Sequence, residues 1–409
     1  MSAGLDAGAR PWRVFAGIGA LYLGFGVVVA LLQGGLPPIL RARGMPVEQM
    51  AWVFALYLPV GLAFVWAPLV DRLRLPFLSP RIGWIVAAQA VAVAALAAVA
   101  LLEHAALPLL FALGLVVALA VATMDLALDA LAVELTGAQA KPLAAALKLA
   151  ALSLGALIGG GVFVGLLARI GWAPTFALVA LLLALTLLPV FGLVGADRAA
   201  GARRPAAEGG ARLYGALRQG AMRRRLGLLV LVASAIFPLT ALNRVMLVDL
   251  GVPLERIAWL VGTAQPVGML FASAVSCPLI RRLGNVGAFA AFAALGLACL
   301  ALLWWGAQAH AQGPAIVGAI GMAAVVGGLM VVCASLTLLW SVGAQAATSY
   351  AVLFCGARLA GIVATMGAGR LAALVDWTTF YATGAAALAA VTALLLAWLP
   401  SLQRTEEPS

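Results

Sequence analysis

Long apolar runs separated by short polar breaks dominate this sequence. Each run holds about 20 residues or more, the length that an α-helix needs to cross about 30 Å of hydrocarbon. Only 10% of the 409 residues are charged and 65% are hydrophobic, so polar side chains could not cover a water-facing surface. We therefore predict an all-α membrane protein that crosses the bilayer many times.

Breaking the runs at charges, prolines and glycine clusters predicts twelve transmembrane helices. They cover about residues 14–40, 47–70, 82–102, 108–135, 143–168 and 174–194, then 226–250, 257–280, 286–308, 314–341, 348–374 and 378–399. This division predicts a six-helix domain at 1–194, a basic cytoplasmic linker at 195–225 and a second six-helix domain at 226–409.

An internal repeat supports two matched halves. Eight residues meet an identical residue 207 positions later: Gly44, Pro46, Glu48, Ala51, Trp52, Pro59, Val60 and Gly61. Both segments join the first span of a half to its second span. Parallel six-helix repeats of this kind resemble the major facilitator fold, in which the substrate binds between the halves near mid-membrane.

The formal net charge of +11 is explained by membrane orientation. Of the 25 basic residues, four lie in loops opposite the termini (Arg41, Arg43, Arg169 and Arg256), and four lie within or near spans (Lys148, Arg244, Arg358 and Arg370). The other seventeen are on the side of the termini. The positive-inside rule then predicts cytoplasmic termini, and nucleic acid is not needed as a partner.

Residues that would support metal, cofactor or enzyme chemistry are not clustered. The four cysteines, Cys277, Cys299, Cys333 and Cys355, lie in apolar runs without C-x-x-C spacing, and His104 and His310 are isolated. The sequence has no P-loop and no Ser/His or Cys/His set. We predict no metal, no cofactor and no enzymatic activity.

Two carboxylates lie inside the fourth predicted span. Asp125 and Asp129, in the stretch A-T-M-D-L-A-L-D-A, are four residues apart and share one helical face. Charged groups in hydrocarbon normally face a partner or a wet cavity. Because desolvation disfavours a charged carboxylate, Asp125 is predicted to carry the coupling proton. Asp129 shares that role or pairs with a basic residue on a neighbouring span. For both acids, the alternative is helix-to-helix bonding alone. Glu134, on the opposite side, is predicted to be a structural charge near Lys141.

Three basic residues are candidates for substrate contact. Arg358 lies about 15 Å inside its span, where it either pairs with an acid or receives an anionic group of the substrate. Lys148 and Arg244 are further candidates, with snorkelling or interhelical pairing as the alternative. Side chains predicted to shape a pocket, with helix packing as the alternative, are Tyr22, Tyr57, Gln33, Asn243, Gln265 and Trp340.

The second span ends in the stretch V-W-A-P-L-V-D-R-L-R, with Asp71 and Arg72. An acid here can hold a helix N-terminus or a basic residue until transport breaks the contact. These two residues are predicted to act in gating. A charge cluster that only orients the protein is the alternative.

Several stretches resemble the muropeptide permease group of the major facilitator superfamily. They are F-V-W-A-P-L-V-D-R at 64–72, R-I-G-W at 81–84, Gln89, M-D-L-A-L-D-A at 124–130 and S-L-G-A-L-I-G-G-G at 153–161. The group carries Gln-Asp-Ile-Ala-x-Asp-Gly in its fourth span, so both acids match while Met124 and Ala130 depart. The group also has an arginine near Ser153, for which Lys148 is the candidate substitute. A compact twelve-span chain is more similar to the related pyochelin- and rhizobactin-type siderophore permeases.

The resemblance implies a secondary active transporter that works by alternating access in the bacterial inner membrane. We expect proton-coupled import of a siderophore-like iron chelate. Alternatives are a muropeptide or other organic-anion permease, a drug or solute efflux pump and, outside this class, a membrane scaffold or enzyme subunit. The expected partners are a small-molecule substrate (a ferric siderophore), protons and the lipid bilayer. We expect the protein to function as a monomer.

Overall fold

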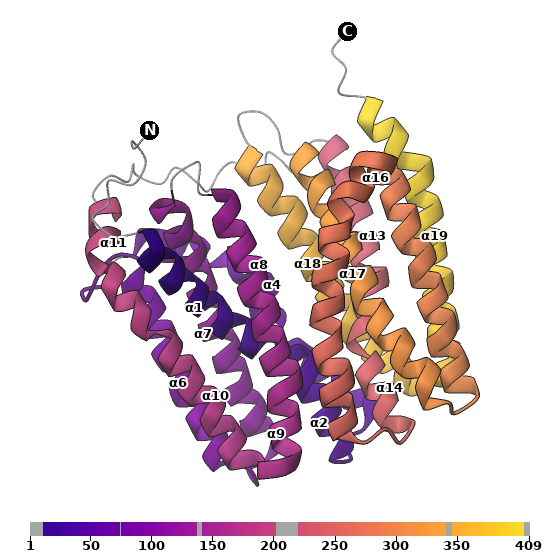
Figure 1. The fold of residues 1–409 in the computed structure, drawn as a ribbon, viewed down its shortest axis with the longest axis horizontal. Helices are drawn as coiled ribbons and strands as arrows, with labels where there is room; N and C mark the ends of the chain where they lie inside the picture. The colour runs from indigo at the N-terminus through magenta and orange to yellow at the C-terminus, as the bar shows by residue number, and fades with distance from the viewer. Residues whose placement is uncertain (1–10, 74, 137–140, 202–219, 341–345, 405–409) are drawn as a thin grey trace. The chain divides into compact units, whose positions relative to one another are not determined.

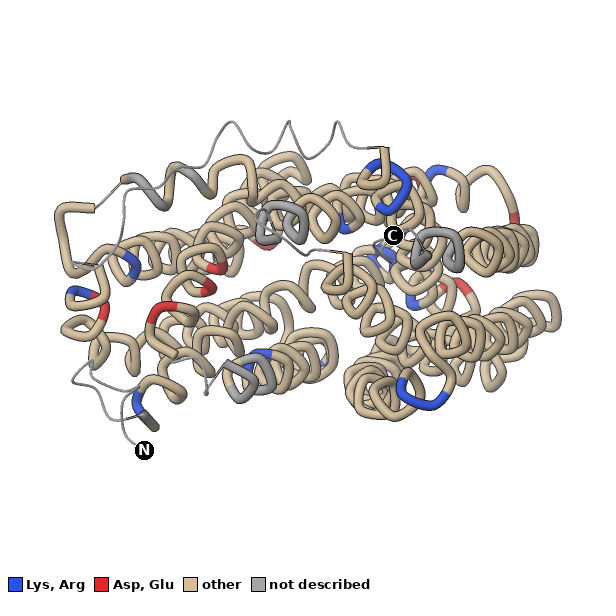
Figure 2. The backbone as a smooth tube through the Cα atoms, turned by 90° about the horizontal axis from the view of Figure 1, so that it is seen from above, with Lys and Arg blue, Asp and Glu red and all other residues tan. Residues whose placement is uncertain are grey.

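The computed structural model describes residues 11–73, 75–136, 141–201, 220–340 and 346–404. Every regular element within these ranges is a helix, and no strand occurs in them. Charged residues are sparse along the described backbone, as Figure 2 shows. Within these ranges the all-α prediction is confirmed.

Eleven described helical segments are long and apolar enough to cross a membrane. Ten have 19–31 residues, and Leu254–Gln308 has 55. At about 1.5 Å per residue, 55 residues extend about 80 Å, more than twice the thickness of the hydrocarbon core. This segment includes α16 (Gly262–Gln308), which consists of two helical parts that meet at Gly284, where φ is 69°. The spans predicted at 257–280 and 286–308 lie on either side of that glycine.

The chain divides into two compact units, and unit 1 comprises Met1–Gly35 and Pro59–Glu208. Within unit 1, α1 packs against α8 and α7, and α6 packs against both α7 and α10 (Figure 1). Its helices are α1 (Pro11–Ala30), η1 (Leu31–Gly35), η3 (Ala63–Val65), α5 (Ala67–Arg72), α6 (Ile82–Leu101), α7 (Leu107–Leu135), α8 (Lys141–Leu157), η5 (Ile158–Val162), α9 (Phe163–Ile170), α10 (Trp172–Thr186), η6 (Leu188–Leu193) and α11 (Val194–Gly201). The short α4 (Leu58–Leu62) begins one residue before Pro59.

Unit 2 comprises Leu36–Leu58 and Gly209–Ser409. The two parts of α16, before and after Gly284, pack with α17 and α19, and α13 packs against α18. Its helices are α2 (Leu36–Ala42), η2 (Val47–Gln49), α3 (Met50–Ala55), α13 (Gly220–Ala241), α14 (Asn243–Asp249), α15 (Leu254–Arg256), η7 (Ile257–Val261), α16, α17 (Gln312–Trp340), α18 (Ala346–Leu374) and α19 (Trp377–Arg404). Phe289, Leu300, Met322 and Tyr381 are fully buried in its core.

The internal repeat adopts the same turn at both of its copies. Gly44 and Gly251 have φ of 90° and 73°, a conformation that glycine adopts without steric cost. The N–H of Met45 donates to the carbonyl of Leu40, and the N–H of Val252 donates to the carbonyl of Leu247, both at 3.0 Å. These are the bonds of a Schellman helix end, and the four residues match pairwise at the offset of 207. The repeated letters therefore encode a repeated structure.

Residues Leu36–Leu58, here called the arm, group with unit 2, although the sequence division places them with the first half. Irregular backbone marks both ends of the arm. Pro37 and Pro38 have no N–H to donate back along the helix, and the preceding η1 is π-helical. At the other end α3 stops at Ala55, four residues before Pro59. The arm thus starts and ends where regular helix hydrogen bonding is interrupted.

Candidate functional site

Four predicted site residues meet inside unit 1 and form what we call the acidic cluster: Tyr22, Asp125, Asp129 and Lys148. The Lys148 ammonium lies 2.5 Å from Oδ1 of Asp129 and 3.9 Å from Oδ1 of Asp125. The Tyr22 hydroxyl donates to the same Asp129 oxygen at 2.5 Å. Lys148 also lies over the Tyr22 ring, 4.7 Å from its centroid. One basic and two acidic side chains, from α7 and α8, therefore share a site with a phenol from α1.

Close packing of α1 on α8 positions two members of this cluster. A Cβ at Gly155 would lie 2.6 Å from the carbonyl oxygen of Leu23, and one at Gly26 would lie 2.8 Å from that of Leu152. The two helices thus meet backbone to backbone. Lys148 is about two turns before Gly155 on the same face of α8, and Tyr22 is one turn before Gly26 on α1. The glycine contact therefore brings the lysine and the phenol together.

The two acids differ in burial and in contacts. The Asp125 side chain is 17% exposed, whereas that of Asp129 is 49% exposed. Asp129 accepts hydrogen bonds from both Lys148 and Tyr22. Asp129 is therefore the acid that holds both Lys148 and Tyr22, and Asp125 is the more buried of the two acids.

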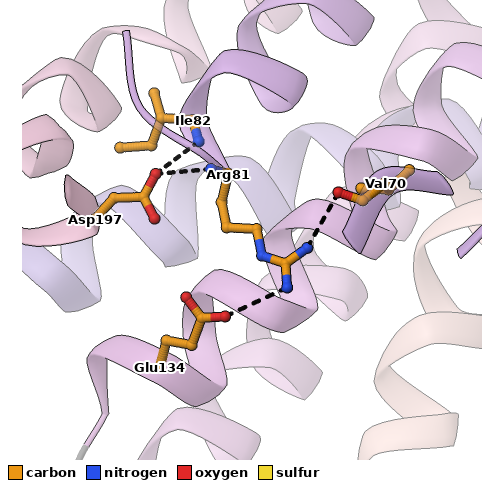
Figure 3. A network of polar contacts seen from close by, with 5 residues as sticks. All are labelled: Val70, Arg81, Ile82, Glu134 and Asp197. Carbon is orange, nitrogen blue, oxygen red and sulfur yellow. Dashed lines mark hydrogen bonds and ion pairs between the residues drawn. The ribbon is translucent and has the colours of Figure 1, made fainter. Parts of the chain in front are cut away.

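A second polar network lies at the start of α6 (Figure 3). Of its charged residues, the sequence had indicated only Glu134 as a structural charge. The buried Asp197 carboxylate, from α11, accepts the backbone N–H groups of Arg81 at 2.8 Å and Ile82 at 3.0 Å. The Arg81 guanidinium donates to the Val70 carbonyl at 3.5 Å and to Glu134 at 3.4 Å. Asp197 thus caps the start of α6, where an acid is favourable, and Arg81 ties α5 to α7.

This network gives Glu134 a basic partner on another helix. The sequence suggested Lys141 as its neighbour, but the structure places Arg81 beside Glu134, and the Lys141 side chain lies outside the described residues. Asp197 was missed because it follows the sixth span in a charged stretch that reads as linker. The backbone places the predicted gating residues Asp71 and Arg72 at the end of α5, but their side chains are outside the described part.

Unit 2 holds the predicted Arg358 and Tyr57 together. The Arg358 guanidinium donates to the Tyr57 hydroxyl at 2.5 Å and lies 5.4 Å from the centre of the ring. Tyr57 is in the arm and Arg358 is in α18. A phenol is uncharged, so the Tyr57 contact orients the guanidinium and brings no negative charge to it. A carboxylate could replace the phenol in a bidentate, charge-assisted contact.

The arm is also fastened by contacts that sequence reasoning missed. Arg41 forms an ion pair with Asp249 at 2.5 Å, and the Trp377 indole donates to the other oxygen of that carboxylate at 3.0 Å. Arg41 was read from the sequence as a loop charge that only orients the protein. Its partner is 208 residues away, so no local pattern could reveal the pair.

Arg244, Gln265 and Asn243 form a buried polar group elsewhere in unit 2. Arg244 donates twice to the Gln265 amide oxygen, at 2.9 and 2.6 Å. The Gln265 amide donates to the Ala319 carbonyl at 2.9 Å, and Asn243 donates to the same carbonyl at 3.4 Å. The three predicted residues therefore connect α14, α16 and α17.

The last two predicted pocket residues have different surroundings. Trp340, at the end of α17, is buried and lies under the Arg225 guanidinium, 5.6 Å from the ring centre. Gln33, in η1, is exposed. Neither belongs to the acidic cluster.

Comparison with known proteins identifies the superfamily to which this fold belongs. The sequence pattern of the Major Facilitator Superfamily matches residues 14–243, more than half of the chain. This chain belongs to the Major Facilitator Superfamily. Members of this superfamily are secondary transporters, and this chain is a multi-pass membrane protein.

One curated relative is the anhydromuropeptide permease of Escherichia coli (strain K12). It is 30% identical over 167 residues, which cover 40% of this chain and 34% of the permease. The match thus spans about a third of that relative's length. It confirms the resemblance to the muropeptide permease group.

Solved transporters match almost the full length. The nucleoside transporter NupG superposes with a TM-score of 0.72 at 14% identity, covering 95% of this chain and 99% of that one. A D-xylose-proton symporter gives 0.67 at 12% identity, covering 95% and 97%. Identities this low establish the shared fold and leave the substrate open.

Proposed function

We propose that this transporter imports a carboxylate-bearing organic solute of muropeptide type, coupled to protons, across the bacterial inner membrane. The similarity to the anhydromuropeptide permease supports this substrate class. We count Leu254–Gln308 as two crossings, which gives twelve spans in two six-helix halves and both termini on one side. The excess of basic residues on that side supports cytoplasmic termini.

In this proposal Asp125 carries the proton. The observation that carries it is the asymmetry within the acidic cluster: Lys148 and Tyr22 both contact Asp129, while Asp125 is more buried and 3.9 Å from the lysine. Lys148 then stays on Asp129 when Asp125 changes protonation. Protonation of Asp125 changes the net charge of the acidic cluster by one. This change in charge drives the switch between the outward-open and inward-open conformations.

The substrate carboxylate is received by Arg358. The Tyr57 hydroxyl, which accepts a hydrogen bond from Arg358, belongs to a neutral phenol that a bidentate carboxylate can displace. Displacement would free the arm at one of its attachments. Alternating access then requires the Arg41–Asp249 and Trp377–Asp249 contacts to break as well. Substrate binding and arm release are thus linked through one arginine. Arg244 is a second candidate anion partner.

Uptake into proteoliposomes tests the proposal. A labelled anhydromuropeptide and a labelled ferric siderophore are offered with and without an inward proton gradient. We expect gradient-driven accumulation of the muropeptide, reduced at least tenfold by Arg358→Gln, whereas Arg256→Gln serves as the control. Accumulation of the ferric siderophore alone would restore the substrate first expected from the sequence and overturn this one. Accumulation without any gradient would overturn proton coupling.

A further inference from the structure

A groove on unit 2 lies apart from the acidic cluster and from the contacts of Arg358 and Arg244. It has a volume of about 590 Å³ and runs between the part of α16 before Gly284 and the second half of α17. Its lining residues are Cys277, Ile280, Arg281, Val331, Ala334, Ser335, Leu338 and Leu339. Apart from one guanidinium and one hydroxyl, the lining side chains are apolar or a thiol. An apolar chain of a ligand would fit these walls.

The walls of the groove belong to the surface of unit 2. Leu338 is 62% exposed and Leu339 is 50% exposed, and Cys277 is exposed as well. These residues lie on helices that are long and apolar enough to cross a membrane. Such a surface contacts hydrocarbon, so the molecules that reach the groove first are lipids.

Positive charge gathers at the end of unit 2 where the groove lies. Arg281 lines the groove, Arg282 follows it, and Arg225 lies against Trp340 at the end of α17. Arg223 and Arg224 are exposed beside Arg225. The described acids of unit 2 are Glu48, Asp249, Glu255 and Asp376, which lie at the opposite ends of these helices. Among the residues whose side chains are described, this end of unit 2 therefore carries these five arginines and no acid.

We propose that the groove binds an anionic phospholipid, with one acyl chain along α16 and α17 and the phosphate on Arg281. A zwitterionic lipid would bring its own cation to a cluster of arginines and lose the electrostatic gain. A basic pocket between transmembrane helices, open to lipid, is the arrangement that selects anionic head groups. The site is separate from the acidic cluster and does not depend on the transported substrate.

Native mass spectrometry of the purified full-length protein tests this inference. The probes are phosphatidylglycerol and phosphatidylcholine with matched acyl chains, added to delipidated protein in the same detergent. We expect retained phosphatidylglycerol adducts and few phosphatidylcholine adducts. Arg281→Gln is expected to lower phosphatidylglycerol affinity about fivefold, the effect of roughly one arginine near a membrane surface. Arg256→Gln is the matched control, because Arg256 is an exposed arginine of α15, at the other end of unit 2.

A second pair of variants tests the acyl-chain part without changing charge. Ala334→Phe fills the groove, whereas Val317→Phe places the same side chain on an exposed position of α17 away from it. Only Ala334→Phe should reduce phosphatidylglycerol retention. Equal retention of both lipids, or equal loss in the control variants, would overturn the proposal. So would a co-purifying protein that occupies the groove and is displaced by Ala334→Phe while lipid binding is unchanged. Gel filtration of each variant confirms that it is folded.

Discussion

A double-mutant cycle on Lys148 and Asp129 would test the acidic cluster in depth. Their charged groups are 2.5 Å apart, with side chains 30% and 49% exposed. Exposed pairs contribute at most about 1 kcal/mol, and breaking a fully buried pair costs about 3–5 kcal/mol. A half-buried pair falls between these limits, so we expect an interaction energy of about 1–3 kcal/mol between Lys148→Gln and Asp129→Asn.

The cycle also predicts an order of transport activities. In Asp129→Asn the lysine loses its closest partner, and Asp125 is 3.9 Å from it. Lys148 then moves onto Asp125 and opposes its protonation. The double variant Asp129→Asn with Lys148→Gln removes that obstacle. We therefore expect the double variant to accumulate substrate several-fold better than Asp129→Asn alone.

The assay combines thermal unfolding in one detergent with gradient-driven uptake in proteoliposomes. For a chain of 409 residues, about 1 kcal/mol corresponds to a shift of about 1–2 °C. Two outcomes would refute the reasoning. One is additive destabilisation by the two single substitutions, within about 0.5 kcal/mol. The other is a double variant that is no more active than Asp129→Asn.

Three further predictions concern the surrounding structure. Gly155→Ala should destabilise the protein by about 1–3 kcal/mol and reduce uptake, because its methyl group would meet the α1 backbone. Gly367→Ala is the control in the same thermal-unfolding comparison and should be tolerated, since nothing lies within 4 Å of the added Cβ. Asp197→Ala should cost about 2–4 kcal/mol, since two buried N–H groups lose their acceptor, and hydrogen exchange at the start of α6 should rise; unchanged exchange would contradict the capping role. Asp249→Asn should loosen the arm, so that a cysteine introduced at the buried Met50 reacts faster with a maleimide than it does in the Glu255→Gln control.

The apolar runs determined the fold at the level of helices. Their length and composition predict a multi-pass helical protein because bilayer thickness limits what such a chain can form. The repeat at Gly44 and Gly251 likewise predicts a matched turn, since both sites need positive φ. The sequence predicted one span over 14–40 but did not reveal the π-helical stretch Leu31–Gly35, which precedes Pro37 and Pro38 within the helical segment Trp12–Ala42. Prolines inside apolar runs are compatible with either a continuous kinked helix or a break.

Site residues were easier to find than their partners. Charge inside an apolar run identified Asp125, Asp129, Lys148 and Arg358. Partners that are more than a hundred residues apart depend on helix packing, which is why Arg41–Asp249 and Arg81–Asp197 were missed. Glu134 shows what local reasoning leaves out, because the helix arrangement places Arg81, 53 residues away in sequence, beside it.

The proton role of Asp125 is the central claim, and one measurement tests it most directly. Asp125→Asn is reconstituted in proteoliposomes, and substrate uptake is followed with an inward proton gradient and, separately, as exchange with substrate loaded inside. The account predicts that gradient-driven accumulation is lost while exchange continues, because the variant still binds and moves substrate but cannot release a proton. Accumulation equal to that of the unmodified protein over the same pH range would contradict it.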